Sequence, residues 1–251
     1  MKKVIFALMM IAMSGMTFVS CNGKKEVTPE KKVANEMATA YNNHEWEKVV
    51  SKGDSAKSMG FDFMAEENSA YTMCYAEGLD IAGRNSEAVT MLKAYLDKFP
   101  KDYYIAQTLG NVYYGKNNKM AHKYYELAFK INPNYARPYI HNAELYEMDK
   151  DYGNAIDNYL SALGLFASHD MYAEIVEFSG KILDMPVELS YGCKRICMIL
   201  KAYGYKNLGA DTMYSTIRSR MGDNVTASLD SLCNLGWNKY VEVSSQNSHQ
   251  K

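Results

Sequence analysis

A pattern of small residues recurs along this chain with a period of about 34 residues, and no other feature of the sequence restricts the fold as strongly. The matching positions are Ala88, Ala121 and Ala155 in one set, and Ala76, Gly110 and Ala143 in another. A fixed period of this length is typical of a supersecondary unit that is stacked on copies of itself. One unit alone cannot bury its apolar face, so the pattern predicts an array of units packed side by side.

The spacing inside one unit predicts two helices joined by a turn. One set of residues with helical spacing is Leu109, Gly110 and Tyr113, and the next set is Ala121, Tyr125 and Ala128. Residues three or four positions apart share one face of a helix. Small residues in each set let the helix backbones approach, while the larger side chains fill the space beside them. Pro133 then ends the second helix, because the residue before a proline disfavours the helical conformation.

This order of residues, L-G-x2-Y followed by A-x3-Y and a closing proline, resembles the tetratricopeptide repeat. The resemblance implies an all-α protein, a right-handed superhelical solenoid of antiparallel helix pairs. Three clear repeats are expected at 69–102, 103–135 and 136–169. They lie within a helical-repeat domain expected over 31–240, with divergent repeats or caps at both ends.

The two ends of the domain are predicted from helical spacing alone. Upstream, Val33, Met37 and Tyr41 form a face like that of the first helix of a repeat. Downstream, apolar residues continue with helical spacing, and Pro186 suits the first turn of a further helix. Residues 241–251 are expected to be a polar tail.

The N-terminus predicts export. Two lysines precede an apolar run over residues 4–13, which has the form of a secretory signal and is too short for a membrane-spanning helix. Residues 17–21 resemble a bacterial lipobox, in which Cys21 becomes the lipidated first residue. We therefore expect a lipoprotein signal peptide over 1–20, and a lipidated cysteine with a flexible tether over 21–30. The alternative is an ordinary secretory signal in which the cysteine is incidental.

The residue that follows Cys21 bears on the expected location. It is Asn22 rather than aspartate, which in some bacteria favours passage to the outer membrane. No acidic run follows to indicate export to the cell surface. The protein is therefore expected in the bacterial cell envelope, lipid-anchored, at the outer membrane and facing the periplasm.

The sequence offers little chemistry for an enzyme. Gly78 and Gly83 are spaced like the glycines of a phosphate-binding loop, but the required lysine is absent and the segment falls within a repeat. His44 begins a zinc-protease motif that lacks its second histidine. The formal charge of −1 gives no basic footprint for nucleic acid. We expect no enzymatic activity, no metal site, no cofactor and no nucleic-acid partner.

The four cysteines that follow the signal are interpreted as core thiols. Cys74 and Cys233 lie in segments with apolar helical spacing, while Cys193 and Cys197 lie one helical turn apart. Export would permit a disulfide, so a bridge between some pair stays open as an alternative.

The remaining candidate site is the face of the first helices that the repeats leave outward. In a tetratricopeptide array these helices line the concave groove, and a partner protein or peptide would bind there. The predicted groove residues are Tyr104, Gln107, Asn111, Tyr114, Arg137, Ile140 and Glu144. The alternative is an ordinary solvated helix face, since every amphipathic helix has one.

These features together favour a membrane-anchored scaffold for protein–protein interaction, although the sequence does not identify the partner. One alternative is an assembly factor of the type found in the outer-membrane barrel-insertion complex. Another is a carbohydrate-capture lipoprotein, for which a cluster of exposed tryptophans would be the sign. Trp46 and Trp237 are far apart in the sequence and do not indicate such a cluster.

Overall fold

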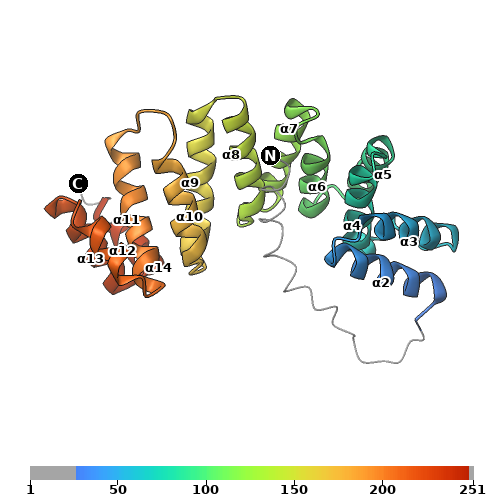
Figure 1. The fold of residues 1–251 in the computed structure, drawn as a ribbon, viewed down its shortest axis with the longest axis horizontal. Coiled ribbons are helices and arrows are strands. Elements are labelled where there is room, and N and C mark those ends of the chain that lie inside the picture. Colours follow the sequence, from blue (N-terminus) through green and yellow to red (C-terminus); the bar gives the residue numbers. More distant parts are fainter. Residues whose placement is uncertain (1–26, 249–251) are drawn as a thin grey trace. The chain divides into compact units, whose positions relative to one another are not determined.

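The computed structural model describes residues 27–248, and all regular secondary structure within this range is helical (Figure 1). The expected signal peptide, Cys21 and Asn22 lie outside the described residues. None of the described helices combines the length and the apolar character needed to span a bilayer. The all-α expectation is therefore confirmed for the described range.

The chain divides into two compact units, which meet in sequence between Val112 and Tyr113. The elements of unit 1 are α2 (Pro29–Asn42), α3 (Trp46–Ser58), the 3-10 turn η2 (Glu66–Asn68), α4 (Ser69–Ile81), α5 (Asn85–Lys98) and α6 (Tyr103–Tyr113). The elements of unit 2 are α7 (Asn118–Ile131), α8 (Ala136–Met148), α9 (Tyr152–Ser168), α10 (Tyr172–Leu183), α11 (Tyr191–Asn207), α12 (Asp211–Arg218), α13 (Asp223–Leu235) and α14 (Trp237–Ser248).

Each of the three expected repeat ranges contains two helices. Helices α4 and α5 fall in 69–102, and α8 and α9 fall in 136–169, and in both cases the two helices pack against each other. The range 103–135 contains α6 and α7, and the division between the units falls at the last turn of α6. The continuous solenoid and its handedness stay predictions.

The prolines mark the ends of the second helices as expected. Helix α5 ends at Lys98 before Pro100, and α7 ends at Ile131 before Pro133. In the third range Ala167 takes the place of the proline, and α9 continues to Ser168. The longer helix follows directly from the missing proline, because nothing at that position disfavours the helical conformation.

The residues expected on the packing faces are buried. Leu109, Ala121 and Ala128 are 0% exposed and Tyr125 is 1% exposed. In unit 2, Ala121 and Tyr125 form an apolar cluster with Leu145. The helical spacing therefore predicted these four buried positions correctly.

The glycines that resembled a phosphate-binding loop have structural roles in unit 1. A Cβ atom placed on Gly78 in α4 would lie 2.5 Å from Cγ1 of Val49 in α3, so only glycine lets the two helices approach this closely. Gly83 has a φ of +81° in the turn after α4, a conformation that side chains disfavour. The spacing of these glycines thus follows from packing and from the turn.

Three expected boundaries differ from the structure. Helix α2 begins at Pro29, within the expected tether, because proline is favourable in the first helical turn. Pro186 precedes α11 instead of starting it, since Ser190 caps that helix by accepting a hydrogen bond from the backbone N–H of Cys193 (3.2 Å). Residues 241–248 of the expected tail continue α14, which packs against α13 and α9.

Candidate partner-binding faces

The predicted groove residues are divided between the two units. Unit 1 holds Tyr104, Gln107 and Asn111, all on α6, and unit 2 holds Tyr114, Arg137, Ile140 and Glu144. Gln107 is 7% exposed and Ile140 is 8% exposed, so these two side chains offer little surface to a partner. The other five residues of the predicted groove are partly exposed. One groove lined by all seven residues stays a prediction.

In unit 1, hydrogen bonds join the first helices of neighbouring pairs. Asn111 on α6 donates from Nδ2 to Oε1 of Glu77 on α4 (3.1 Å). Tyr41 on α2 donates to the other carboxylate oxygen of Glu77, and Ser69 at the start of α4 donates to Asp102 just before α6. Both bonds between α4 and the α6 segment join residues 33 or 34 positions apart, so the helices lie in the register that the period predicts.

Among residues 27–248, the side-chain carbonyl oxygen of Gln107 has no hydrogen-bond partner. With the same offset, Gln107 corresponds to Met73 on α4, whose thioether has no hydrogen to donate. Gln107 is thus a buried amide on the same face as Asn111, one helical turn away. Its contribution to a partner-binding face is therefore small.

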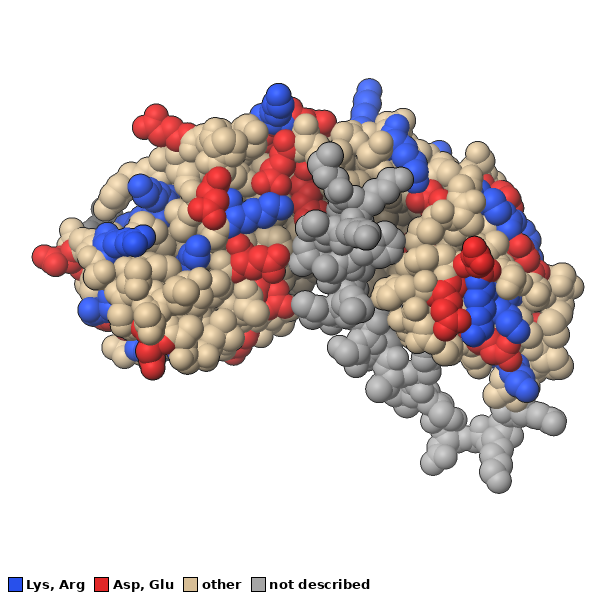
Figure 2. Space-filling view, in the orientation of Figure 1, with Lys and Arg blue, Asp and Glu red and all other residues tan. Residues whose placement is uncertain are grey.

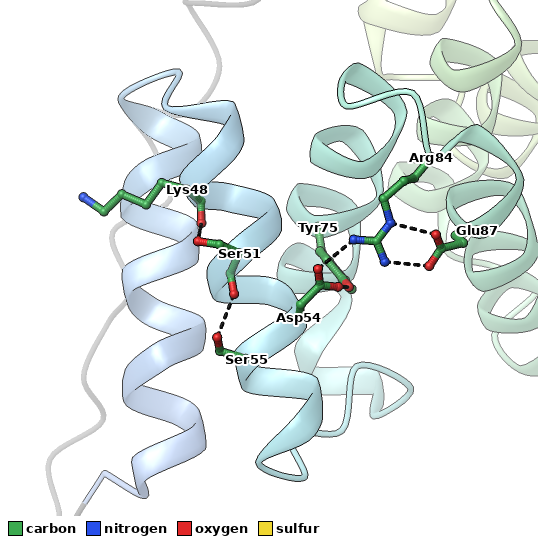
Figure 3. Close-up of polar contacts among 7 residues, drawn as sticks. All are labelled: Lys48, Ser51, Asp54, Ser55, Tyr75, Arg84 and Glu87. Atoms are coloured by element: carbon green, nitrogen blue, oxygen red, sulfur yellow. Dashed lines mark hydrogen bonds and ion pairs between the residues drawn. The ribbon is translucent and has the colours of Figure 1, made fainter.

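A network of ionic contacts around Arg84 links the helices of unit 1 (Figure 3). Arg84 donates from Nη1 to Asp54 on α3 (2.7 Å) and from Nε and Nη2 to the two carboxylate oxygens of Glu87 on α5 (2.7 Å each). Tyr75 on α4 donates its hydroxyl to the same Asp54. The hydrogen bond from Arg84 holds the pKa of Asp54 below its usual value. These charges link α3, α4 and α5.

In unit 2, two glutamates on α8 lie beside one lysine of α10. The ammonium of Lys181 is 3.0 Å from Oε2 of Glu147 and 3.8 Å from Oε1 of Glu144. It also lies over the ring of Tyr159 on α9, 4.8 Å from the ring centroid, while the Tyr159 hydroxyl donates to Glu147 (3.1 Å). His141 lies 3.3 Å from the other carboxylate oxygen of Glu144.

The pKa values of this cluster follow from burial and charge. Burial favours the neutral form of Glu144, but the hydrogen bond with His141 and the positive charges nearby outweigh it and lower its pKa. Burial raises the pKa of Tyr114 to about 12, with further contributions from the negative charges of Glu144 and Glu147. At neutral pH Glu144 is therefore ionised, whereas the Tyr114 hydroxyl is neutral.

Replacing Lys181 with methionine is expected to lower the free energy of unfolding by about 1–2 kcal/mol at pH 7. Methionine keeps the apolar stem but leaves two neighbouring carboxylates without their lysine. Because the pKa of Glu144 is lower in the folded protein, the stabilisation is present above the unfolded-state pKa and disappears as the pH falls through the folded value. Urea denaturation at pH 7 and at about pH 3, well below the ordinary pKa of glutamate, measures this difference.

Lys239→Met is the matched control for this measurement. Lys239 pairs with Glu242 at 2.8 Å, but both side chains are more than half exposed, so its loss should change stability little. An equal loss of stability in Lys181→Met at both pH values would contradict the ionic role of Lys181.

The repeat pattern of the sequence did not indicate Lys181. It lies on α10, beyond the third expected repeat, where the period is no longer recognisable. The repeat period does indicate both glutamates. Glu147 lies 33 residues after Tyr114, and Glu144 lies 33 residues after Asn111. Repeat spacing therefore finds the carboxylates of the cluster but not the cation that joins them.

Each unit also has a surface hollow outside these faces. One in unit 1, of about 520 Å³, is lined by Phe61, Phe63, Met64 and Met91 with charged residues among them. One in unit 2, of about 500 Å³, is lined by His122, Tyr146 and charged side chains of both signs. Within residues 27–248, no group of three or more His, Cys, Asp or Glu side chains is arranged to hold a metal ion.

Charged side chains of both signs are interspersed on the face of the molecule drawn in Figure 2. The ion pairs of both units fit this distribution, since lysine or arginine alternates with aspartate or glutamate across neighbouring helices. Such a surface suits partners with mixed charge rather than a polyanion.

Comparison with known proteins gives a distant structural likeness. No protein-family model matches the sequence, and no curated protein matches it. Among the solved structures that match is a chain titled "MamA RS-1 ArsTM double mutant". The two chains are 15% identical, and the match covers 57% of this chain and 78% of that chain with a TM-score of 0.48. The function is therefore inferred from the residues of this chain.

Proposed function

We propose that this protein is a scaffold for protein–protein interaction, anchored to the membrane through a lipid on Cys21, which binds a segment of a partner protein along its helix pairs. The proposal extends the tetratricopeptide resemblance to function. Arg137 is the observation that carries it. This side chain is half-buried on α8, and no ion pair or hydrogen bond of Arg137 occurs among residues 27–248.

An unpaired, half-buried arginine suits a contact with a partner. Its guanidinium has five N–H donors in a fixed plane and binds a carboxylate through two of them. Arginine and tyrosine are also the residue types in which binding energy concentrates at protein interfaces. Arg137 lies near the start of α8, the helix that also carries Glu144. A partner segment with an acidic side chain would complete the pairing of Arg137.

The partner is best identified by crosslinking in the native host. A photo-crosslinking amino acid at position 114 should capture a defined protein, whereas the same group at exposed position 123 should not. Mass spectrometry of the crosslinked product then identifies the partner, and its purified form serves for affinity measurements.

Alanine variants should each weaken binding of that partner by about 1–2 kcal/mol, which is about a 5- to 30-fold increase in Kd. The variants are Arg137→Ala and Tyr114→Ala in unit 2, and Tyr104→Ala in unit 1. Lys123→Ala is the control and should leave the affinity unchanged. A triple variant that keeps its helicity and binds the partner with unaltered affinity would show that the predicted face is not the site.

The carbohydrate alternative receives no support from the tryptophans. Trp46 begins α3 in unit 1, where its ring lies 5.5 Å from that of Tyr41, and Trp237 begins α14 in unit 2. Each unit thus has one tryptophan, and neither forms a two-tryptophan platform for a sugar. The alternative of an outer-membrane assembly factor would use the same protein-binding face, and the identity of the crosslinked partner distinguishes it.

A further inference from the structure

Two cysteines lie one turn apart on helix α11, outside the proposed binding face. Cys193 and Cys197 are four residues apart, so their side chains project from the same face of the helix. Both are free thiols. Cys197 is 0% exposed, whereas Cys193 is partly exposed and gives access to the pair from solvent.

Helix geometry keeps this pair reduced. Residues four apart on a helix have Cβ atoms about 5–6 Å apart, whereas a disulfide requires about 3.8 Å. Forming the bond would therefore require α11 to unwind near its start. The N-cap opposes such unwinding, because the Ser190 hydroxyl oxygen accepts a hydrogen bond from the backbone N–H of Cys193 (3.2 Å). Side chains whose Cβ atoms are about 5–6 Å apart can still direct both sulfur atoms toward one ion while the backbone stays helical.

We propose that Cys193 and Cys197 form a two-thiolate site for a soft monovalent metal ion of the Cu(I) class. Thiolates are the ligands that select Cu(I). The described residues offer no cluster of three or more ligands, so the pair does not belong to a tetrahedral zinc site. Two sulfur ligands satisfy an ion that accepts linear coordination.

Binding replaces two protons with one metal ion. Two S–H bonds break, two metal–sulfur bonds form, and two protons leave to solvent, with no change in oxidation state. The resulting complex has one negative charge.

A lysine on the same face of α11 can offset that charge. Lys201 lies four residues after Cys197, so the three side chains follow one stripe of the helix. A Cβ atom built on Gly180 of α10 would lie 2.9 Å from the ammonium of Lys201, so the glycine leaves room for this side chain. Lys201 therefore places a positive charge one helical turn after Cys197.

The test uses Ag(I), a redox-stable ion with the same ligand preference, added to the full mature chain with excess glutathione. Native mass spectrometry should show one Ag(I) per chain. Two thiols on one helix can bind the ion together and retain it against glutathione, whereas a single thiol would lose it to glutathione. Cys193→Ser should lower the affinity by more than about 100-fold, beyond the effect expected of an outer-shell change. Circular dichroism checks that the variant is folded, and partly exposed Cys193 is the safer of the two positions to change.

Cys233→Ser is the matched control, because Cys233 is also partly exposed but is a single thiol on α13. It should bind Ag(I) like the unmodified chain. Retention of Ag(I) by folded Cys193→Ser would overturn the proposal, and so would a failure of the unmodified chain to retain the ion against glutathione. Neither outcome depends on the partner-binding function.

Discussion

Gly53→Ala is expected to destabilise unit 1 by about 2–3 kcal/mol. Gly53 lies on α3 where that helix meets α4, and a Cβ atom there would lie 2.2 Å from Cδ2 of Tyr75. The Tyr75 ring cannot easily move, because it is 1% exposed, stacks on Phe63 at 4.9 Å and donates its hydroxyl to Asp54. The higher helix propensity of alanine offsets only about 1 kcal/mol of this cost.

Thermal and urea denaturation measure the effect, and Gly164→Ala on α9 is the matched control. Gly164 is in the interior of a helix, and no atom of the described residues lies within 4 Å of a Cβ placed on it. That variant should be more stable by about 0.5–1 kcal/mol, since alanine reduces the conformational entropy of the unfolded chain. If both variants are stabilised alike, the close approach of α3 and α4 is wrong.

Cys21→Ala is expected to move the protein from the membrane fraction to the soluble fraction of the native host. The reason is that two or three acyl chains on Cys21 would give stable anchoring, which the variant would lose. Incorporation of a fatty-acid analogue should be lost at the same time. Cell fractionation and in-gel detection of the analogue measure the two effects.

Cys233→Ala serves as the control for this prediction, since it removes a cysteine from α13 without affecting the N-terminus. That variant should stay labelled and membrane-bound. A Cys21→Ala protein that still incorporates the analogue would disprove lipidation at this residue. A variant that loses the label but stays on the membrane would show that a protein partner, rather than a lipid, holds it there.

Much of the helical architecture was predictable because it depends on local spacing. Ala88, Ala121 and Ala155 recur at the predicted period, and all three are 0% exposed. Pro100 and Pro133 follow the ends of two helices as expected. A helix face and a helix end depend on residues within a few positions of one another, so the order of residues alone specifies them.

The candidate site was less predictable, because helical spacing finds the face of a helix but not what covers it. Gln107 and Ile140 belong to the predicted groove set, yet both are buried, whereas Arg137 and Tyr114 are partly exposed. The exposure of each side chain depends on its neighbours on other helices. The spacing of residues within one repeat does not specify those neighbours.

The sequence by itself determined that this chain forms pairs of helices, that the small residues recurring with the period are buried, and where proline ends a helix. Only the tertiary structure decided that Lys181 joins Glu144 and Glu147, that Gly53 leaves room for Tyr75, and that α14 continues to Ser248 against α9. The physical reason is the range of the interactions. Helix periodicity is local, whereas an ion pair, a close backbone approach or the docking of a terminal helix depends on residues from different helices that only folding brings together.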